Sequence, residues 1–189
     1  MNEALGVLKV EASAGPLDVA SLHEAHADFV WRSLCRLGVR EADADDMMQE
    51  VFVVVHRRLS TYVAGGKVTT WLFGICLRVA AAYRRRACNR REQLVGEAPD
   101  PWVSPDPPPD SIAEAREAQQ RLKSLLDELD LEKRAIFVMF EIDEMPCDEI
   151  ASLLGVAVGT VYSRLHAARK AFAAALGRLQ AREARMRGF

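Results

Sequence analysis

The stretch Pro146–Phe172, PCDEIASLLGVAVGTVYSRLHAARKAF, decides the fold of this chain. It predicts two short helices, Cys147–Leu154 and Val158–Phe172, separated by a turn at 155–157. In the second helix, four apolar side chains at spacings of four, three and four share one stripe: Val161, Leu165, Ala168 and Phe172. A helix of this kind packs on one side and leaves the other side free to enter a groove. The pair therefore has the pattern of a helix-turn-helix.

The face opposite the stripe is small and polar, with basic residues on its flanks. The residues that point away from the stripe are Ser163, His166, Ala167 and Lys170, and those on its flanks are Thr160, Tyr162, Arg164 and Arg169. An ordinary helical hairpin with a solvated face shows the same periodicity. The charge favours the nucleic-acid interpretation, because from Gly159 onward seven basic residues stand against one acid, Glu183. A surface whose charges are nearly all positive can bind the phosphates of a nucleic acid.

Charges are segregated along the whole chain. The 189 residues are 50% apolar and 28% charged, as in an ordinary globular protein, with a net charge of −2. Residues 67–91 contain seven basic residues and no acids, whereas residues 92–130 contain ten acids and three basic residues. The nearly neutral average therefore hides two basic blocks separated by an acidic one.

The sequence argues against a secreted or membrane protein. The N-terminus has no basic region followed by an apolar core, so it does not resemble a secretory signal. The longest uncharged run near Trp71 has 10 residues, against about 20 needed to cross a bilayer. The four cysteines are scattered without a C-x-x-C pair, which favours reduced thiols over a metal or disulfide role. We expect a cytoplasmic protein with no membrane insertion.

Catalysis and metal binding are not expected either. His23 and His26 stand three residues apart, but no third ligand lies near them in the sequence, so we interpret them as surface histidines. No Ser/His/Asp or carboxylate constellation and no glycine loop that could cradle a phosphate is present. We expect no enzyme activity and no cofactor.

Two helices are predicted before the first basic block. The first begins at Ser21 as its N-cap and ends at Gly38, and the second covers residues 41–59 with acids in its first turns, where the helix dipole favours them. In the second helix an acidic and amide surface stands beside an apolar row: the surface is Asp45, Asp46, Gln49 and Glu50, and the row includes Phe52. Such a surface can dock a basic partner helix.

A third helix is predicted from about residue 70 to residue 89, after a loop at 60–67. It carries Trp71 near its start and most of the first basic block. Trp71 can be a core residue, or it can hold an unstacked base beside the arginines, because stacking on an aromatic ring needs no sequence-specific hydrogen bond. Downstream, further helices are predicted from Ser111 to about Leu129 and over 131–140.

Three motifs in this order resemble the bacterial RNA polymerase sigma factors of the extracytoplasmic-function (ECF) group. They are DADDMMQEVF (43–52), TTWLFGICLRVAAAYRRR (69–86) and EIASLLGVAVGTVYSRLHAARKAF (149–172). The resemblance implies an all-α protein of two small helical domains, a region 2 bundle and a region 4 helix-turn-helix, joined by a flexible linker. The expected parts are a tail (1–18), a region 2-like domain (19–93), a proline-rich linker (94–111), a region 4-like domain (112–182) and a basic tail (183–189).

The resemblance also implies a role for each surface. The residues expected to bind the clamp helices of the polymerase β′ subunit are Asp45, Asp46, Gln49, Glu50 and Phe52. The residues expected at the promoter −10 element are Tyr62, Lys67, Thr70, Trp71, Arg78, Arg84, Arg85 and Arg86. The residues expected at the −35 element are Thr160, Tyr162, Ser163, Arg164, His166, Ala167, Arg169 and Lys170. The β flap of the polymerase and an anti-sigma factor are further expected partners.

Two positions depart from the family pattern. Arg78 stands where the family commonly has an asparagine, and Ala82 where an aspartate is frequent. An arginine strengthens phosphate attraction but loses the base discrimination of an amide, which puts the −10 preference in doubt. The alternatives to a sigma factor are a stand-alone helix-turn-helix regulator and a helical adaptor that binds only protein.

Overall fold

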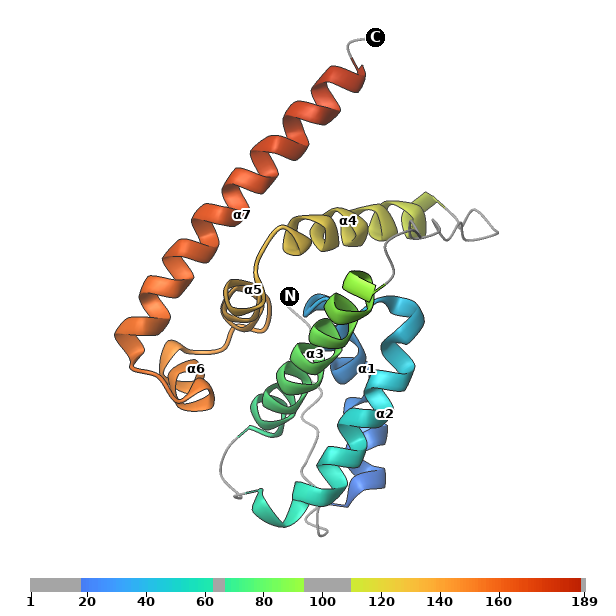
Figure 1. Ribbon diagram of the computed structural model, residues 1–189, viewed down its shortest axis with the longest axis vertical. Coiled ribbons are helices and arrows are strands. Elements are labelled where there is room, and N and C mark those ends of the chain that lie inside the picture. The colour runs from blue at the N-terminus through green and yellow to red at the C-terminus, as the bar shows by residue number, and fades with distance from the viewer. Residues whose placement is uncertain (1–17, 63–66, 94–109, 188–189) are drawn as a thin grey trace, which may run out of the picture.

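The computed structural model describes residues 18–62, 67–93 and 110–187 of the chain (Figure 1). All regular structure within these ranges is helical, and no strand occurs in them. The expectation of an all-α protein is confirmed. The proline-rich stretch expected to link the two halves lies almost wholly outside the described residues.

Three helices form the N-terminal half, and they pack against one another through apolar faces. They are α1 (Val19–Arg36), α2 (Glu41–Arg58) and α3 (Val68–Gln93), and a short 3-10 turn, η1 (Leu59–Thr61), follows α2. Val30 and Leu34 of α1, Val55 of α2 and Leu72 of α3 are fully buried. Val30 and Leu34 are four residues apart, so they lie on one face of α1.

Asp18, and not Ser21, caps the first helix. One carboxylate oxygen of Asp18 accepts the backbone N–H of Ser21 at 2.9 Å, and the other accepts the Ser21 hydroxyl at 2.8 Å. The prediction of Ser21 as N-cap was wrong by one turn. An aspartate three residues earlier satisfies the free N–H group better than a serine inside the first turn can.

The C-terminal half consists of four α-helices and a π-helical turn. They are α4 (Asp110–Asp127), α5 (Leu131–Phe137), the π-helix η2 (Val138–Ile142), α6 (Cys147–Leu154) and α7 (Val158–Arg187). Helix α6 and the start of helix α7 lie where the sequence predicted them. Gly155 closes α6 with φ +66°, a left-handed conformation that a glycine adopts without strain. The stripe of α7 faces inward, with Val161, Leu165 and Ala168 buried.

Helix α7 is longer than predicted. It continues past Phe172 to Arg187, because residues 173–187 contain no proline and consist mostly of strong helix formers. An ion pair of 2.9 Å between Arg178 and Glu128 joins this extension to the end of α4. In Figure 1 the C-terminal end of α7 extends beyond the rest of the molecule.

One local detail of the C-terminal half also differs from the prediction. The helix predicted over 131–140 changes at Val138 from α to π geometry. The π-helical turn buries Val138 and Met139.

The two halves of the molecule share one apolar core. A single cluster of buried residues includes Leu72 and Ile75 of α3 together with Ile136 of α5 and Ile150 of α6. In Figure 1, α3 lies between α1 and α2 on one side and α5 and α6 on the other. At Gly74 the approach is close, because a Cβ atom there would lie 2.7 Å from Cδ1 of Leu153. The C-terminal half therefore packs directly on α3.

Candidate nucleic-acid interface

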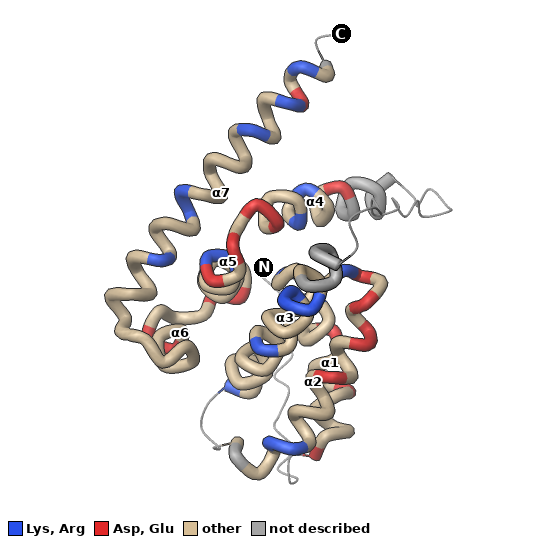
Figure 2. Tube along the Cα trace, viewed as in Figure 1, with Lys and Arg blue, Asp and Glu red and all other residues tan. Residues whose placement is uncertain are grey.

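The first turns of α7 expose a polar face opposite their buried stripe. Tyr162 is 59% exposed. Ser163, His166 and Lys170 are also exposed, whereas Thr160 and Ala167 are half-buried. Figure 2 shows Lys and Arg residues at intervals along α7 after its first turns. An exposed face on a helix whose other side is anchored is the geometry that major-groove reading requires.

Two arginines of this face are paired with acids of the same chain. The Arg164 guanidinium lies 3.6 Å from the carboxylate of Glu132. The guanidinium of Arg169 donates to Glu141 at 2.6 Å and lies 5.2 Å from the centre of the Phe140 ring. Half-exposed ion pairs of this kind contribute about 0–1 kcal/mol. A DNA phosphate or base edge can therefore displace the carboxylates.

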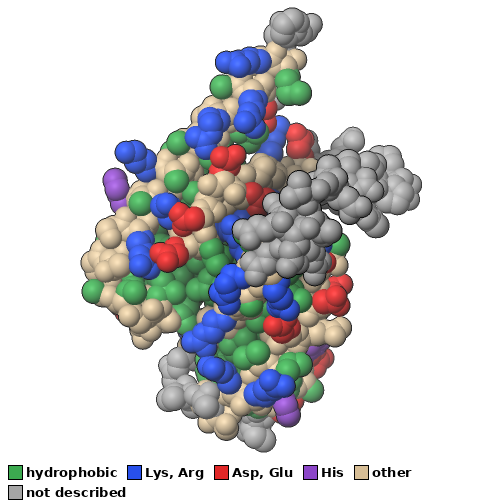
Figure 3. Space-filling view, viewed as in Figure 1, with side chains coloured by type: hydrophobic (Ala, Val, Ile, Leu, Met, Phe, Trp, Pro, Cys, Tyr) green, Lys and Arg blue, Asp and Glu red, His purple; other side chains and the backbone are tan. Residues whose placement is uncertain are grey.

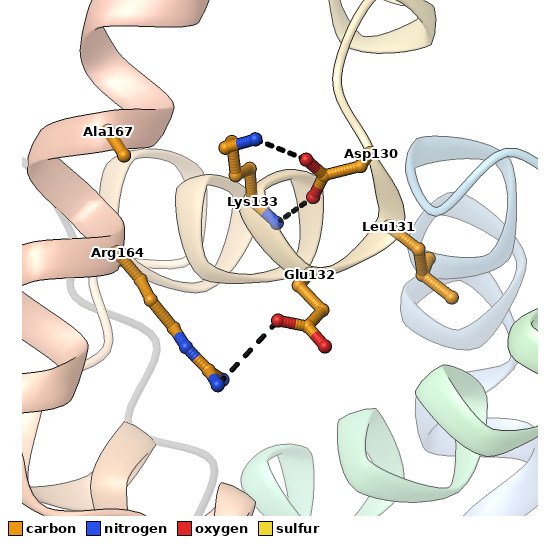
Figure 4. A pocket seen from close by; sticks show the side chains of 6 residues that line it. All are labelled: Asp130, Leu131, Glu132, Lys133, Arg164 and Ala167. Carbon is orange, nitrogen blue, oxygen red and sulfur yellow. Dashed lines mark hydrogen bonds and ion pairs between the residues drawn. The ribbon is translucent and has the colours of Figure 1, made fainter.

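A shallow pocket separates α5 from α7 beside Arg164 (Figure 4). Its lining residues are Asp130, Leu131, Glu132, Lys133, Arg164 and Ala167. Arg164 reaches across the pocket toward Glu132, while Lys133 turns back to the N-terminus of α5 and contacts Asp130. The carboxylate of Asp130 accepts the Lys133 backbone N–H at 2.9 Å, and the hydrogen bonds from Lys133 lower the pKa of Asp130.

The start of α3 is in contact with α6. The Lys67 ammonium lies 3.2 Å from one carboxylate oxygen of Glu149, and the Thr70 hydroxyl donates to the other oxygen at 3.2 Å. A single acid of the helix-turn-helix thus binds two residues expected at the −10 element. Next to them, Trp71 is half-buried against the core and its ring centre lies 5.3 Å from that of Tyr62. Trp71 is therefore partly a core residue.

The arginines of α3 differ in their surroundings. Arg78 and Arg85 are exposed, and Arg84 is half-buried. Arg86 donates to both carboxylate oxygens of Glu50 at 3.0 and 3.3 Å, which ties α3 to α2. The exposed members supply the positive charge that Figure 2 shows on α3.

Tyr83 fixes α3 to the start of α2. Its hydroxyl donates to Asp43 at 2.5 Å, and the Arg40 guanidinium donates to the same carboxylate at 2.8 Å. Burial and the bond to Asp43 raise the pKa of Tyr83, so the phenol stays protonated as a donor. The basic face of α3 is therefore held at a fixed angle to α2.

The acidic surface predicted on α2 is only partly open to solvent. Asp45, Asp46 and Gln49 are exposed. Glu50 is paired with Arg86. Phe52 is 7% exposed and packs against the His23 ring, with 4.6 Å between ring centres. Phe52 thus belongs to the buried core beneath this acidic surface.

Family models match both halves of the chain, in order. The model described as Sigma-70 region 2 matches residues 22–91, and the model described as Sigma-70, region 4 matches residues 119–172. The sigma factor CnrH of Cupriavidus metallidurans is 31% identical over 184 residues, which cover 93% of this chain and 95% of CnrH. The chain belongs to the sigma-70 family.

Other relatives are named as members of the ECF group of these sigma factors. The ECF sigma factor SigE of Mycolicibacterium smegmatis is 34% identical over 145 residues, which are 77% of this chain but only 56% of SigE. The solved structure of CnrH in complex with the cytosolic domain of CnrY superposes with a TM-score of 0.61 and 25% identity, covering 84% of this chain and 87% of that one. The resemblance to the ECF group that the three sequence motifs indicated is confirmed.

Several polar residues that organise this sigma factor were missed from the sequence. Glu132, Glu141 and Glu149 pair with the predicted DNA-facing residues, but their partners lie on other elements and no local pattern links them. Arg134 is buried to 1% exposure. Arg134 precedes the apolar run AIFVMF, but it is the last of three consecutive charged residues, so no local signal marked it as buried.

Neither a metal site nor a single membrane-spanning helix occurs within the ranges that the structure describes. No group of three or more His, Cys, Asp or Glu side chains converges there, and His23 instead packs against Phe52. No single helix is both long and apolar enough to span a membrane. The bent pair α6–α7, with 105° between its parts, satisfies length and composition only when the two helices are combined.

Proposed function

We propose that this chain is an ECF-type sigma factor that binds core RNA polymerase, recognises promoter −35 and −10 elements and promotes transcription initiation. One observation carries the proposal: the two family regions follow each other at 22–91 and 119–172, and each contains a basic helix with an exposed face. A stand-alone helix-turn-helix regulator needs only the second region. A protein-only adaptor needs neither basic face.

Each surface has a distinct task in this function. The exposed face of α7 reads the −35 element in the major groove, with Arg164 as the residue best suited to a guanine edge. The start of α3, with Trp71 and the arginines that follow it, holds the opened −10 strand by stacking and phosphate contacts. The exposed acids of α2, Asp45 and Asp46, bind the β′ clamp helices. The C-terminal half also meets the β flap.

The remaining parts of the proposal follow from the same assignment. The domains are 19–93 and 112–182, and residues 94–111 link them. The protein acts in the cytoplasm, without a cofactor and without catalysis of its own. Because the solved relative CnrH is in complex with the cytosolic domain of CnrY, we include an anti-sigma factor among the partners of this chain.

Run-off transcription with purified core polymerase tests the function. Promoters are first selected by sequencing the DNA fragments that the reconstituted holoenzyme retains from a genomic pool. Added protein should start transcripts from these fragments and should co-purify with core polymerase. DNA binding without core association would instead support the stand-alone regulator, and association with neither would support the adaptor.

A further inference from the structure

Helix α7 carries one arginine on each side of its exposed polar face. Arg164 and Arg169 are five residues apart, so their side chains point about 140° apart around the helix axis. The exposed residues Ser163, His166 and Lys170 lie on the arc between them. A helix about 10–12 Å in diameter fills a major groove that is about 12 Å wide. The two flanks of α7 therefore face the two sugar-phosphate backbones when the polar face enters a groove.

The two flanking arginines differ in their position along α7. Arg164 stands six residues after Val158, the first residue of the helix, and the recognition helices of such motifs contact base edges with their N-terminal residues. Arg169 comes later, about 7.5 Å farther along the axis. The base contact is therefore assigned to Arg164, whereas Arg169 is placed to meet a phosphate of the backbone.

The π-helical turn η2 holds Arg169 at two points. The Nε of Arg169 donates to a carboxylate oxygen of Glu141 at 2.6 Å. The guanidinium carbon lies 5.2 Å from the centre of the Phe140 ring, a distance at which the aromatic face attracts a cation. On the other flank, acidic and basic side chains lie together between α5 and α7 (Figure 3), and Arg164 is 3.6 Å from Glu132, too far for a hydrogen bond. Of the two arginines, Arg169 is thus the one whose orientation is fixed.

The π geometry of η2 suits this double contact. The backbone N–H of Asp143 donates at 3.0 Å to the carbonyl of Val138, five residues back. A turn of this kind holds more residues than an α-helical turn, so adjacent side chains diverge by a smaller angle. The adjacent residues Phe140 and Glu141 accordingly both reach the same arginine of α7. Single π-helical turns occur frequently at functional sites.

A stacked pair of rings aligns η2 with α7 next to this contact. The rings of Phe137 and Phe172 lie 4.5 Å apart between centres, with 19° between their planes. Phe140 stands three residues after Phe137, and Arg169 three residues before Phe172. The two contacts are therefore neighbours in one packed row, and Phe137 at its inner end is buried. The core thus sets the place of the Phe140 ring.

These contacts leave the outer part of the guanidinium available. The side chain of Arg169 is 53% exposed. Its Nε bonds to Glu141, while its two terminal nitrogens have no hydrogen-bond partner among the residues that the structure describes. These nitrogens carry the remaining N–H donors of a planar group whose fork matches the oxygens of a phosphate. A phosphate can therefore bind Arg169 while Glu141 stays in place.

We infer that Phe140 and Glu141 are positioning residues, which hold the guanidinium of Arg169 ready to bind one backbone phosphate of the −35 duplex. The inference rests on the proposed function, because it requires α7 to enter promoter DNA. A free arginine side chain loses conformational freedom when it binds, whereas a side chain that is already fixed loses less. The difference corresponds to about two- to tenfold in affinity for DNA.

Nuclear magnetic resonance of the free full-length chain tests the positioning without DNA. The side-chain Nε–H signal of Arg169, identified by its absence from Arg169→Lys, should exchange slowly with water and stand apart from the signals of exposed arginines. Phe140→Leu and Glu141→Ala should each move the signal toward those of the exposed arginines. Phe140→Tyr keeps the ring and should leave the signal in place. A wild-type signal that coincides with those of the exposed arginines would overturn the positioning.

Binding of the holoenzyme to its selected promoter then tests the phosphate contact. Arg169→Ala should weaken binding equally on promoter variants with single-base changes. It should also reduce the dependence of affinity on salt, with a change of about 0.9 in the slope on logarithmic scales. An unchanged slope would contradict the phosphate contact. Absence of promoter binding by the wild-type holoenzyme would overturn the proposed function, while the signal of the free chain would still decide the positioning.

Double variants separate positioning from general damage to the fold. Phe140→Leu and Glu141→Ala should each weaken promoter binding by about two- to tenfold, but neither should weaken it further in the Arg169→Ala background. Glu141→Gln keeps an oxygen acceptor for Nε and should bind like wild type. Phe172→Leu is the control, since it removes the neighbouring ring contact and should leave DNA binding unchanged. Losses that persist without Arg169, or tighter binding by either Glu141 variant, would overturn the positioning.

Discussion

At the scale of single residues, three cations that we predict to contact DNA are paired with carboxylates of the same chain. Arg164 faces Glu132, Arg169 faces Glu141, and Lys67 faces Glu149. Each pair is at least partly exposed, so salt and competing phosphates weaken it. The carboxylates hold the side chains in place without preventing an exchange of partners.

Arg164 should discriminate among bases once it leaves Glu132. Arg164→Ala is expected to weaken holoenzyme binding to its selected promoter by roughly 1–3 kcal/mol and to relax the preference at one base pair of the −35 element. Competition binding with single-base variants of that promoter measures both effects. Arg178→Ala is the control, because Arg178 is likewise paired with an acid, Glu128, on the same helix but is not among the residues expected at the −35 element. An equal loss on every promoter variant would make Arg164 a phosphate contact.

At the scale of elements, short-range chemistry sets the boundaries of the helices. Gly155 ends α6 in the left-handed conformation, and Asp130 begins α5 by accepting the Lys133 N–H. The cap at Asp130 matters more than most, because α5 has only seven residues and carries Arg134. A helix this short depends on its cap and on tertiary packing.

Loss of the Asp130 cap should destabilise the protein by about 1 kcal/mol. Lys133 lowers the pKa of Asp130 in the folded state below its ordinary value of 3.8. The charged cap therefore contributes stability above that value and loses it as the pH falls through the lowered pKa. Urea unfolding of Asp130→Ala should show the loss at neutral pH and a smaller difference from wild type in acid.

The control for the cap is Asp130→Asn, which keeps an oxygen acceptor without the charge. It should recover most of the lost free energy of unfolding at neutral pH. If the alanine and asparagine variants are equally destabilised, the ion pair with Lys133 is responsible and not the cap.

At the scale of the whole molecule, the sequence predicted the elements better than their assembly. Apolar periodicity and Gly155 located α6 and the buried face of α7. The extension of α7 to Arg187 was missed because the prediction followed the apolar stripe only as far as Phe172, although residues 173–187 contain no proline. The packing of the two halves could not be predicted, since Arg134 and Glu149 find partners about 80 to 100 residues away. Such pairs leave no periodic trace in the sequence.

For the candidate surfaces too, the sequence predicted features within one helix better than contacts between helices. The outward face of α7 follows from helical geometry alone, and Tyr162 and Lys170 are exposed as that geometry requires. Phe52 is buried, as its place in the apolar row of the second helix predicted, and its contact with polymerase stays a prediction. Periodicity places a side chain on a face of its helix, but only the tertiary fold decides whether another helix covers that face.

The acidic surface of α2 offers the last test, because it should bind polymerase independently of the DNA surfaces. Asp46 is exposed, whereas Glu50 is paired with Arg86 of α3. Asp46→Lys changes only the docking surface, while reversal of Glu50 would also release a cation assigned to the −10 strand. We expect Asp46→Lys to weaken binding to core polymerase by roughly tenfold or more, since like charges placed across an interface repel. Glu24→Lys on α1 makes the same change at an exposed position outside the surface and should leave the affinity unchanged. Equal affinities of both variants, measured by titration of labelled protein with core enzyme, would remove Asp46 from the polymerase interface.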